Sequence, residues 1–288
     1  MWKNLKTRIL FRGNNMGENN GVLICGEVDG DKPSSVALEL LGIGRILADA
    51  LGEKLSIVFI DKNADACGQI AVSHGADTVY SVTDAPAQQF EAASHASIIE
   101  KLSTDKGSPR ILLLSHTMTG RVLAPMLAFK LKAGLVMDCL GLEIDPETKG
   151  LLAQKPVSGG NVLATYSFKE GGIQMATVRR KAMEPAEPDE GRQGTIENVP
   201  AGVDASAVKT KIVERVIEET EGPNIETAEI VVTGGRGIGS TEDFEGHIKN
   251  GLAAVLNAGI GATRAAVDSG YITEPHQVGL TGKIVGPN

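Results

Sequence analysis

Two glycine-flanked segments near the end of the chain carry the polar side chains that could do chemistry. The first, residues 261–270, is a short apolar run that contains a hydroxyl and the guanidinium of Arg264. The second, residues 277–283, is a turn in which Gln277 supplies an amide and Thr281 a hydroxyl. A cation, hydroxyls and closely spaced glycines suit a planar, redox-active, anion-bearing cofactor, because the backbone can approach the ligand and its charge is compensated.

Arg264 lies in the apolar stretch 262–267, and a guanidinium is costly to bury there unless an anion or a planar partner compensates it. Asp268 could supply the compensating charge in a simple ion pair, and a bound cofactor is the other interpretation. The turn at 277–283 could likewise be an ordinary polar turn.

A third glycine-rich segment, residues 234–240, joins a predicted strand at 229–233 to a helix predicted to run to about Leu256. We expect Thr241-Glu242-Asp243 to cap this helix, with two acids at its positive end. The evenly spaced glycines resemble a phosphate-binding turn but match neither a GxGxxG nor a Walker A pattern. The segment is also consistent with a tight connection that leaves Arg236 exposed.

The elements that must position these segments follow an α/β pattern. Apolar runs predict strands at 21–26, 55–61, 78–80 and 110–115. Helical patterns predict one helix that begins after Pro33-Ser34. They predict three more over residues 64–75, 88–102 and 122–131. This alternation favours an open, mostly parallel sheet with helices on both faces.

The pattern changes after residue 134. Strand-like runs at 135–144, 161–168 and 173–178 are separated by hairpin signals, so we expect the sheet to gain antiparallel strands. Residues 182–190 predict an exposed connector, and 211–217 a further strand of the same sheet. We expect a poorly ordered leader over 1–20, an α/β domain over 21–222, and a partial second α/β domain over 223–288.

His116 and Arg121 directly follow the predicted strand at 110–115. Ligands of such sheets bind beyond the carboxyl ends of the strands, so both residues could line a cleft. The same residues are also consistent with a capped helix start and a surface arginine.

Composition excludes several classes of function. The net charge of −8 and the lack of a basic stripe argue against nucleic-acid binding. The three dispersed cysteines predict buried reduced thiols rather than a metal site, and no apolar run approaches the length of a membrane span. No nucleophile motif of a hydrolase is present. These features favour a cytoplasmic protein.

Several motifs, in the same order along the chain, strongly resemble the electron transfer flavoprotein alpha subunit. The resemblance covers nearly the whole chain after the leader. In the second domain it rests on residues 233–237, 261–270 and 277–285. In the first domain it rests on Leu123-Ala124-Pro125 and on residues 138–142, 155–161 and 174–179.

The resemblance implies an FAD site in the second domain. By the family pattern, Arg264 lies against the flavin ring and Thr281 offers its hydroxyl near the ring nitrogen N5. The other implied cofactor contacts are Arg236, Thr263, Gln277, Val278, Gly279 and Leu280. A cation beside the ring favours the anionic reduced form and thereby tunes the potential.

The resemblance also implies partners. The first domain would pack against a beta subunit in a heterodimer, and the second would swing between electron partners. Electrons would come from flavin dehydrogenases, such as the acyl-CoA dehydrogenases of fatty acid beta-oxidation, and pass to a quinone reductase or ferredoxin. The chain would be a carrier rather than a catalyst, in the cytoplasm or, in a eukaryote, the mitochondrial matrix. A bifurcating version, with NADH oxidised at a second flavin, stays open.

The chain departs from the family pattern in three places. Thr263 stands where the family usually has serine, and Leu280 where it usually has glutamine, which removes a polar contact near the flavin. The family also continues with a Gly-Ser-Gly segment and further strands, so we expect an incomplete FAD domain here. That motivates an alternative function: a flavin-free, nucleotide-binding-like scaffold that stabilises a beta partner.

Overall fold

The computed structural model describes residues 19–86, 90–169, 171–203, 208, 223–226, 228–279 and 281–285. The chain divides into two compact units, Met1–Ile212 and Val213–Asn288. The predicted domain limits stay a prediction, since most of the leader, the boundary at 222 and the strand expected at 211–217 lie outside the described residues. No helix in the described ranges has the length and apolar character needed to cross a membrane.

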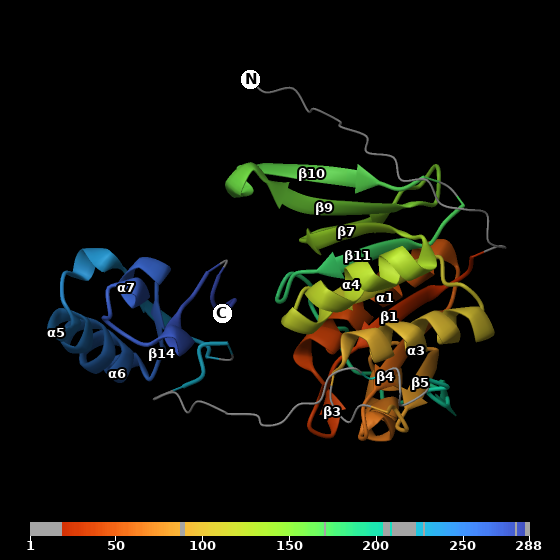
Figure 1. The fold of residues 1–288 in the computed structure, drawn as a ribbon, viewed down its shortest axis with the longest axis horizontal. Helices are drawn as coiled ribbons and strands as arrows, with labels where there is room; N and C mark the ends of the chain where they lie inside the picture. Colours follow the sequence, from red (N-terminus) through yellow and green to blue (C-terminus); the bar gives the residue numbers. More distant parts are fainter. Residues whose placement is uncertain are drawn as a thin grey trace. The chain divides into compact units, whose positions relative to one another are not determined.

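A seven-stranded sheet forms the centre of the first unit, in the order β12-β5-β4-β1-β6-β11-β7 (Figure 1). Its strands are β1 (Val22–Gly26), β4 (Leu55–Ile60), β5 (Thr78–Val82), β6 (Ile111–Ser115), β7 (Gly134–Cys139), β11 (Gln174–Val178) and β12 (Thr195–Asn198). Every neighbouring pair in this sheet is parallel. The predicted open parallel α/β architecture is therefore confirmed.

Helices cover both faces of this sheet because side chains alternate along its strands. The helices are α1 (Ser35–Leu51), α2 (Gly68–Ser73), α3 (Ala92–Asp105) and α4 (Met118–Leu131). In β1, Val22 and Ile24 belong to the core cluster that contains α1 and α2. Leu23 and Cys25 belong to the cluster that contains α3 and α4.

Helix α1 shows why the sequence folds this way locally. Ser34 caps its N-terminus by accepting a hydrogen bond from the N–H of Ala37 at 3.3 Å, and Gly52 ends it with a left-handed φ of 68°. The apolar residues at helical spacing face the core: Val36, Leu40, Ile43 and Leu47 are at most 7% exposed, and Leu51 at the end of the helix is half-buried. The helix predicted to begin after Pro33-Ser34 is therefore present.

Three antiparallel strands form a separate small sheet, in the order β10-β9-β8. They are β8 (Gly141–Ile144), β9 (Leu151–Val157) and β10 (Val162–Ser167). Antiparallel strands were expected after residue 134, but as an extension of the main sheet, and β9 was not predicted. The run predicted at 135–144 is divided at Leu140 into β7 and β8, and within β7 Asp138 adopts a left-handed φ of 65° where the β7–β11 register shifts.

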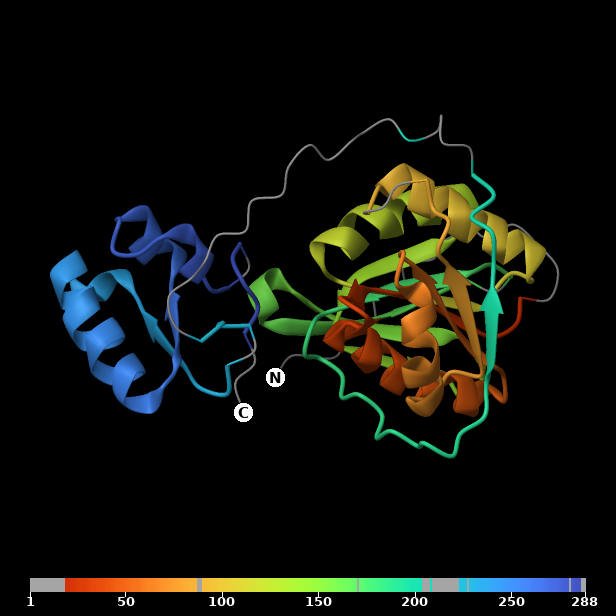
Figure 2. The ribbon, with the colours of Figure 1, turned by 90° about the horizontal axis from the view of Figure 1, so that it is seen from below.

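Short elements complete the first unit: β2 (Val28–Asp29), β3 (Lys32–Pro33), η1 (Ala64–Cys67) and η2 (Ser158–Gly160). The predicted connector at 182–190 is largely exposed and leads from β11 to β12 at the far edge of the sheet (Figure 2). Arg192, in the segment before β12, forms an ion pair with Asp77 at 2.7 Å and so attaches this segment to the residue before β5. In β12, Ile196 packs so closely on Gly68 that a Cβ there would lie 2.8 Å from its Cδ1.

The second unit has two parallel strands, β13 (Val231–Gly234) and β14 (Gly259–Ala262). Its helical elements are η4 (Arg236–Ile238), α5 (Thr241–Asp243), η5 (Phe244–Ala253), α6 (Ala254–Leu256), α7 (Arg264–Asp268) and η6 (Glu274–His276). The helix predicted to reach Leu256 is present as the continuous run α5-η5-α6, and its middle segment has π-helical hydrogen bonding. Phe244 and Ile248 pack from this run against Ile260 and Ala262 of β14.

Candidate functional site

The second unit brings two of the singled-out segments together at the carboxyl ends of its paired strands. Gly234 at the end of β13 stands opposite Ala262 at the end of β14. The next residue, Thr263, donates its backbone N–H to the carbonyl of Gly234 at 3.0 Å. The turn that carries Arg236 and the segment that carries Arg264 therefore leave the sheet at the same edge, where ligands bind in parallel α/β sheets.

The third segment is tied to the same edge by backbone hydrogen bonds. Val278 donates its N–H to the carbonyl of Ala262 at 2.9 Å, and Lys283 donates to the carbonyl of Gln277 at 2.7 Å. Glycine is required at Gly282, since a Cβ there would lie 2.3 Å from the carbonyl oxygen of Gln277. All three segments thus converge at the carboxyl ends of β13 and β14.

Four of the eight predicted contact residues present polar side chains to solvent at this edge. The exposed ones with polar side chains are Arg236, Thr263, Arg264 and Thr281. Gly279 is also exposed, Val278 is half-buried, and Gln277 is only 7% exposed. Leu280, the remaining predicted contact, lies outside the described residues.

Arg264 is not buried, which corrects the expectation drawn from its apolar surroundings. The segment expected to be a strand or buried run bends after Ala262, and Arg264 becomes the first residue of helix α7. Ala262 is buried as the last residue of β14 and Ala266 is buried within α7, whereas Arg264 faces outward, with 66% of its side chain exposed. Its guanidinium lies 3.5 Å from the carboxylate of Asp268, so the ion pair weighed from the sequence is present.

The turn after β13 also differs in detail from its prediction. Ser240, rather than Thr241-Glu242-Asp243, is the N-cap of the helix: its hydroxyl accepts a hydrogen bond from the N–H of Asp243 at 3.0 Å. The two acids do occupy the first turn, as expected. Gly239 supports the tight turn with a φ of 104°, a conformation that favours glycine.

The residues at this edge fit a flat, anion-bearing cofactor. A Cβ added at Gly237 or Gly279 would meet no atom within 4 Å, and one at Gly235 would only reach Thr263 at 3.8 Å. These glycines therefore leave room beside the backbone at the edge that also carries Arg236 and Arg264. Two exposed cations and exposed hydroxyls supply the charge and hydrogen bonds that phosphate and a polar ring require.

His116 and Arg121 fit the simpler of their two interpretations. Thr117 caps α4 by accepting a hydrogen bond from the N–H of Gly120 at 3.2 Å, and Arg121 is exposed on the first turn. The carboxylate of Glu27 lies directly after β1, next to the point where the strand order reverses between β1 and β6. This carboxylate accepts hydrogen bonds from the hydroxyls of Ser115 and Thr117. The chain itself thus places an anion beside the residue that caps α4.

His116 belongs to a polar cluster that was not predicted from the sequence. Its Nδ1 lies 2.8 Å from the hydroxyl of Thr177, and Arg179 donates two hydrogen bonds to Asp138 at 2.8 and 2.7 Å. This ion pair lowers the pKa of Asp138, while burial lowers the pKa of His116, aided by the nearby cations Arg121, Arg179 and Lys155. The partners lie on separate strands, so no spacing in the sequence signals the cluster.

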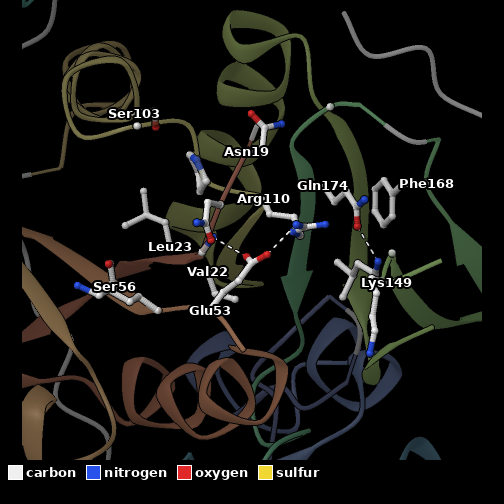
Figure 3. Close-up of a pocket in the computed structure, with 18 of the residues that line it drawn as sticks. Asn19, Val22, Leu23, Glu53, Ser56, Ser103, Arg110, Lys149, Phe168 and Gln174 are labelled. Atoms are coloured by element: carbon white, nitrogen blue, oxygen red, sulfur yellow. Dashed lines mark hydrogen bonds and ion pairs between the residues drawn. The ribbon is translucent and has the colours of Figure 1, made fainter. Parts of the chain in front are cut away.

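In the first unit, a cavity of about 1430 Å³ opens at the amino ends of the strands, at the end of the sheet opposite to His116 (Figure 3). There Glu53 accepts a hydrogen bond from the N–H of Gly21 at 2.6 Å and pairs with Arg110 at 2.7 Å. Gln174 similarly accepts from the N–H of Leu151 at 2.6 Å. These polar groups hold neighbouring loops together.

The cysteines match the expectation of buried thiols. Cys25, Cys67 and Cys139 are all buried and free. Burial raises the pKa of Cys25 and of Cys139 to about 12, which keeps both as unreactive thiols. Within the described ranges, no group of three His, Cys, Asp or Glu side chains is arranged to hold a metal ion.

Both units match known family models. Residues 22–204 match the model described as the electron transfer flavoprotein domain. Residues 224–288 match the model described as the electron transfer flavoprotein FAD-binding domain. The second match contains all three segments that converge at the ends of β13 and β14.

Curated relatives agree with these matches. The electron transfer flavoprotein subunit alpha of Thermoanaerobacterium thermosaccharolyticum is 39% identical over 272 residues, which cover 94% of this chain and 81% of the relative. The subunit of the same name from Megasphaera elsdenii is 36% identical, with 94% and 80% covered. Protein FixB of Clostridium saccharobutylicum is 36% identical, with 95% and 80% covered.

Proposed function

The chain belongs to the electron transfer flavoprotein family, as an alpha subunit and electron carrier, and on this premise we propose that its second unit binds FAD at the carboxyl ends of β13 and β14. The observation that supports this proposal is the convergence of three segments at one edge. Residues 235–240, 263–264 and 277–281 are far apart in the sequence and share that edge through backbone hydrogen bonds.

The side chains at this edge divide into two roles. Arg236 and Arg264 are exposed cations that would attract the negatively charged cofactor, and a guanidinium stays charged at all relevant pH values. Thr263 and Thr281 offer hydroxyls, and Gly279 offers an unobstructed backbone. When bound, FAD supplies the redox chemistry, and the residues of this chain bind it, orient it and bias its potential.

Arg264 is the residue best suited to tune the potential. Its guanidinium is paired with Asp268 at 3.5 Å but remains two-thirds exposed, so it is available to a second anion. A cation beside the cofactor stabilises added negative charge and therefore favours electron uptake. We assign Arg264 this role and assign Val278 and Leu280 to the lining of the site.

We further propose that the chain works in a heterodimer with an electron transfer flavoprotein beta subunit. The relatives are named as alpha subunits, which supports a second subunit. The first unit is the proposed platform, and the second unit the proposed FAD carrier, with limits at 21–222 and 223–288. Flavin dehydrogenases would donate the electrons, and a quinone reductase or ferredoxin would accept them. A cytoplasmic location and a link to fatty acid beta-oxidation stay predictions, and the FixB relatives suggest other roles.

A visible absorption spectrum tests the proposal. The chain is co-expressed with its beta subunit, reconstituted with FAD and freed of excess cofactor. We expect flavin bands from the wild-type heterodimer and much weaker bands after R236A/R264A. A wild-type heterodimer without flavin bands would contradict the carrier function and favour the flavin-free scaffold.

A further inference from the structure

Gln277 occupies an unusual place among the residues at the carboxyl ends of β13 and β14, because it is buried. Only 7% of it is exposed, whereas Thr263, Arg264 and Thr281 all face solvent. Its backbone is held on both sides: its N–H donates to the carbonyl of Glu274 at 2.8 Å, and its carbonyl accepts from Lys283 at 2.7 Å. These two hydrogen bonds fix the backbone position from which the side chain of Gln277 extends.

The side-chain amide of Gln277 donates a hydrogen bond from Nε2 to the hydroxyl oxygen of Thr281 at 2.8 Å. An amide NH₂ group can only donate, so the hydroxyl of Thr281 must accept through a lone pair. The proton of that hydroxyl then has to point away from Gln277. Among the residues that the structure describes, none accepts this proton.

We infer that Gln277 is a positioning residue that fixes the hydroxyl of Thr281 as a hydrogen-bond donor toward the bound cofactor. This inference rests on the proposed FAD site. Gln277 was expected from the family resemblance to contact the cofactor itself, but its burial and its bond to Thr281 indicate that it acts through Thr281. Without the amide of Gln277, the hydroxyl of Thr281 rotates freely and can donate its hydrogen bond to water instead of to the cofactor.

A double-mutant cycle on the FAD-reconstituted heterodimer tests the inference, with FAD affinity, the midpoint potential and the visible spectrum as readouts. Q277M removes the donor at similar size, T281V removes the hydroxyl, and T281S keeps it. We expect Q277M and T281V each to weaken FAD binding by about fivefold, the size of one net hydrogen bond. Q277M/T281V should match T281V alone in affinity, potential and spectrum. T281S should bind FAD as the wild type does.

Reversing the hydrogen bond separates positioning from mere packing. Glu in place of Gln277 has nearly the same shape and can still form a hydrogen bond with Thr281. Its carboxylate, however, can only accept that hydrogen bond, so the hydroxyl of Thr281 becomes the donor toward residue 277. We expect Q277E to lose at least as much FAD affinity as Q277M, and we expect the loss caused by Q277E to shrink in a T281V background. The residual loss in that background reports the added negative charge alone.

Two results would overturn the inference. One is a Q277M effect that persists undiminished in the T281V background, and the other is a Q277E variant with the affinity, potential and spectrum of the wild type. Either result leaves the proposed function intact, because the wild type still binds FAD. A wild-type heterodimer that fails to bind FAD contradicts the proposed function and this inference together.

Discussion

The guanidinium of Arg264 lies 3.5 Å from the carboxylate of Asp268, one helical turn further along α7, and about two-thirds of each side chain is exposed. An exposed pair of this kind contributes at most about 1 kcal/mol to stability. Arg264 therefore does little for the fold, and its position at the end of β14 is better explained by a ligand.

Replacing Arg264 by alanine should separate binding from stability. The free energy of unfolding should change by less than about 1 kcal/mol, since an exposed ion pair is lost. FAD affinity should fall about tenfold, as expected for a lost charge-assisted contact. The midpoint potential should fall as well, because less positive charge remains to stabilise the reduced cofactor. Urea unfolding, FAD titration and redox titration measure the three effects.

Two matched variants sharpen this test. R264K keeps the positive charge and should retain most of the potential shift, whereas D268N removes the competing carboxylate and should raise FAD affinity. A redox titration of R264A that superimposes on the wild type would refute the tuning role.

Replacing Gly279 by alanine should damage the site through the backbone. The φ of 112° is rarely adopted by residues with a Cβ, so the change should cost about 1–3 kcal/mol of stability. It should also weaken FAD binding, since the methyl group occupies space beside the turn. G246A is the control: that position has open space around it and lies in a helical run, so alanine should be neutral or stabilising. Equal effects of the two variants would argue against the assigned role of Gly279.

Replacing Gly68 by alanine should loosen the edge strand β12. A Cβ there would lie 2.8 Å from Cδ1 of Ile196, so this half-exposed side chain must shift, and the first unit should lose about 1 kcal/mol. I196A creates room for the new methyl group, and G68A should therefore be nearly neutral in an I196A background. Urea unfolding of the four proteins measures the coupling. Additive losses would show that Gly68 and Ile196 are energetically independent.

The first unit should lose stability as the pH falls below about 6.5, the ordinary pKa of histidine. Burial lowers the folded-state pKa of His116, so the unfolded chain binds its proton first, and this favours unfolding on acidification. The contribution is fully present above pH 6.5 and is lost as the pH falls toward the folded-state pKa. His95, also buried, acts in the same direction.

Urea unfolding at pH 7.5 and pH 5.5 checks this expectation. H116Q can still reach Thr177 but does not titrate, so it should lose less stability between the two pH values than the wild type. Subtracting the change in the free energy of unfolding of H116Q from that of the wild type removes the contributions of other titrating groups. A variant with an unchanged pH dependence would show that His116 does not contribute.

The elements that could be predicted from the sequence are those with a strong local pattern. Helix α1 has a capping serine, a terminal glycine and an apolar face, and all three operate in the structure. The central strands β1, β4 and β6 are continuous apolar runs because they are buried on both faces. These signals are local, so one sequence suffices.

The missed elements depend on distant contacts. The four residues of β12 have little apolar pattern and become a strand only by pairing with β5, more than 100 residues earlier. Likewise, Arg264 was expected in a buried run because its neighbours are apolar, but the bend after Ala262 changes the spacing from strand to helix. The hydrogen bond between Gln277 and Thr281 depends on a turn geometry that spacing does not specify.

The strand order of the first unit also bears on how the protein leaves the ribosome. β11 lies between β6 and β7, although both are synthesised before it. A nascent chain that has not reached residues 174–178 therefore exposes one edge of β6, a strand of five buried residues, with nothing beside it. Such an edge invites pairing with other chains. Residues 174–178 thus fill the gap between β6 and β7, and we expect the nascent chain to be most prone to pairing with other chains before they are synthesised.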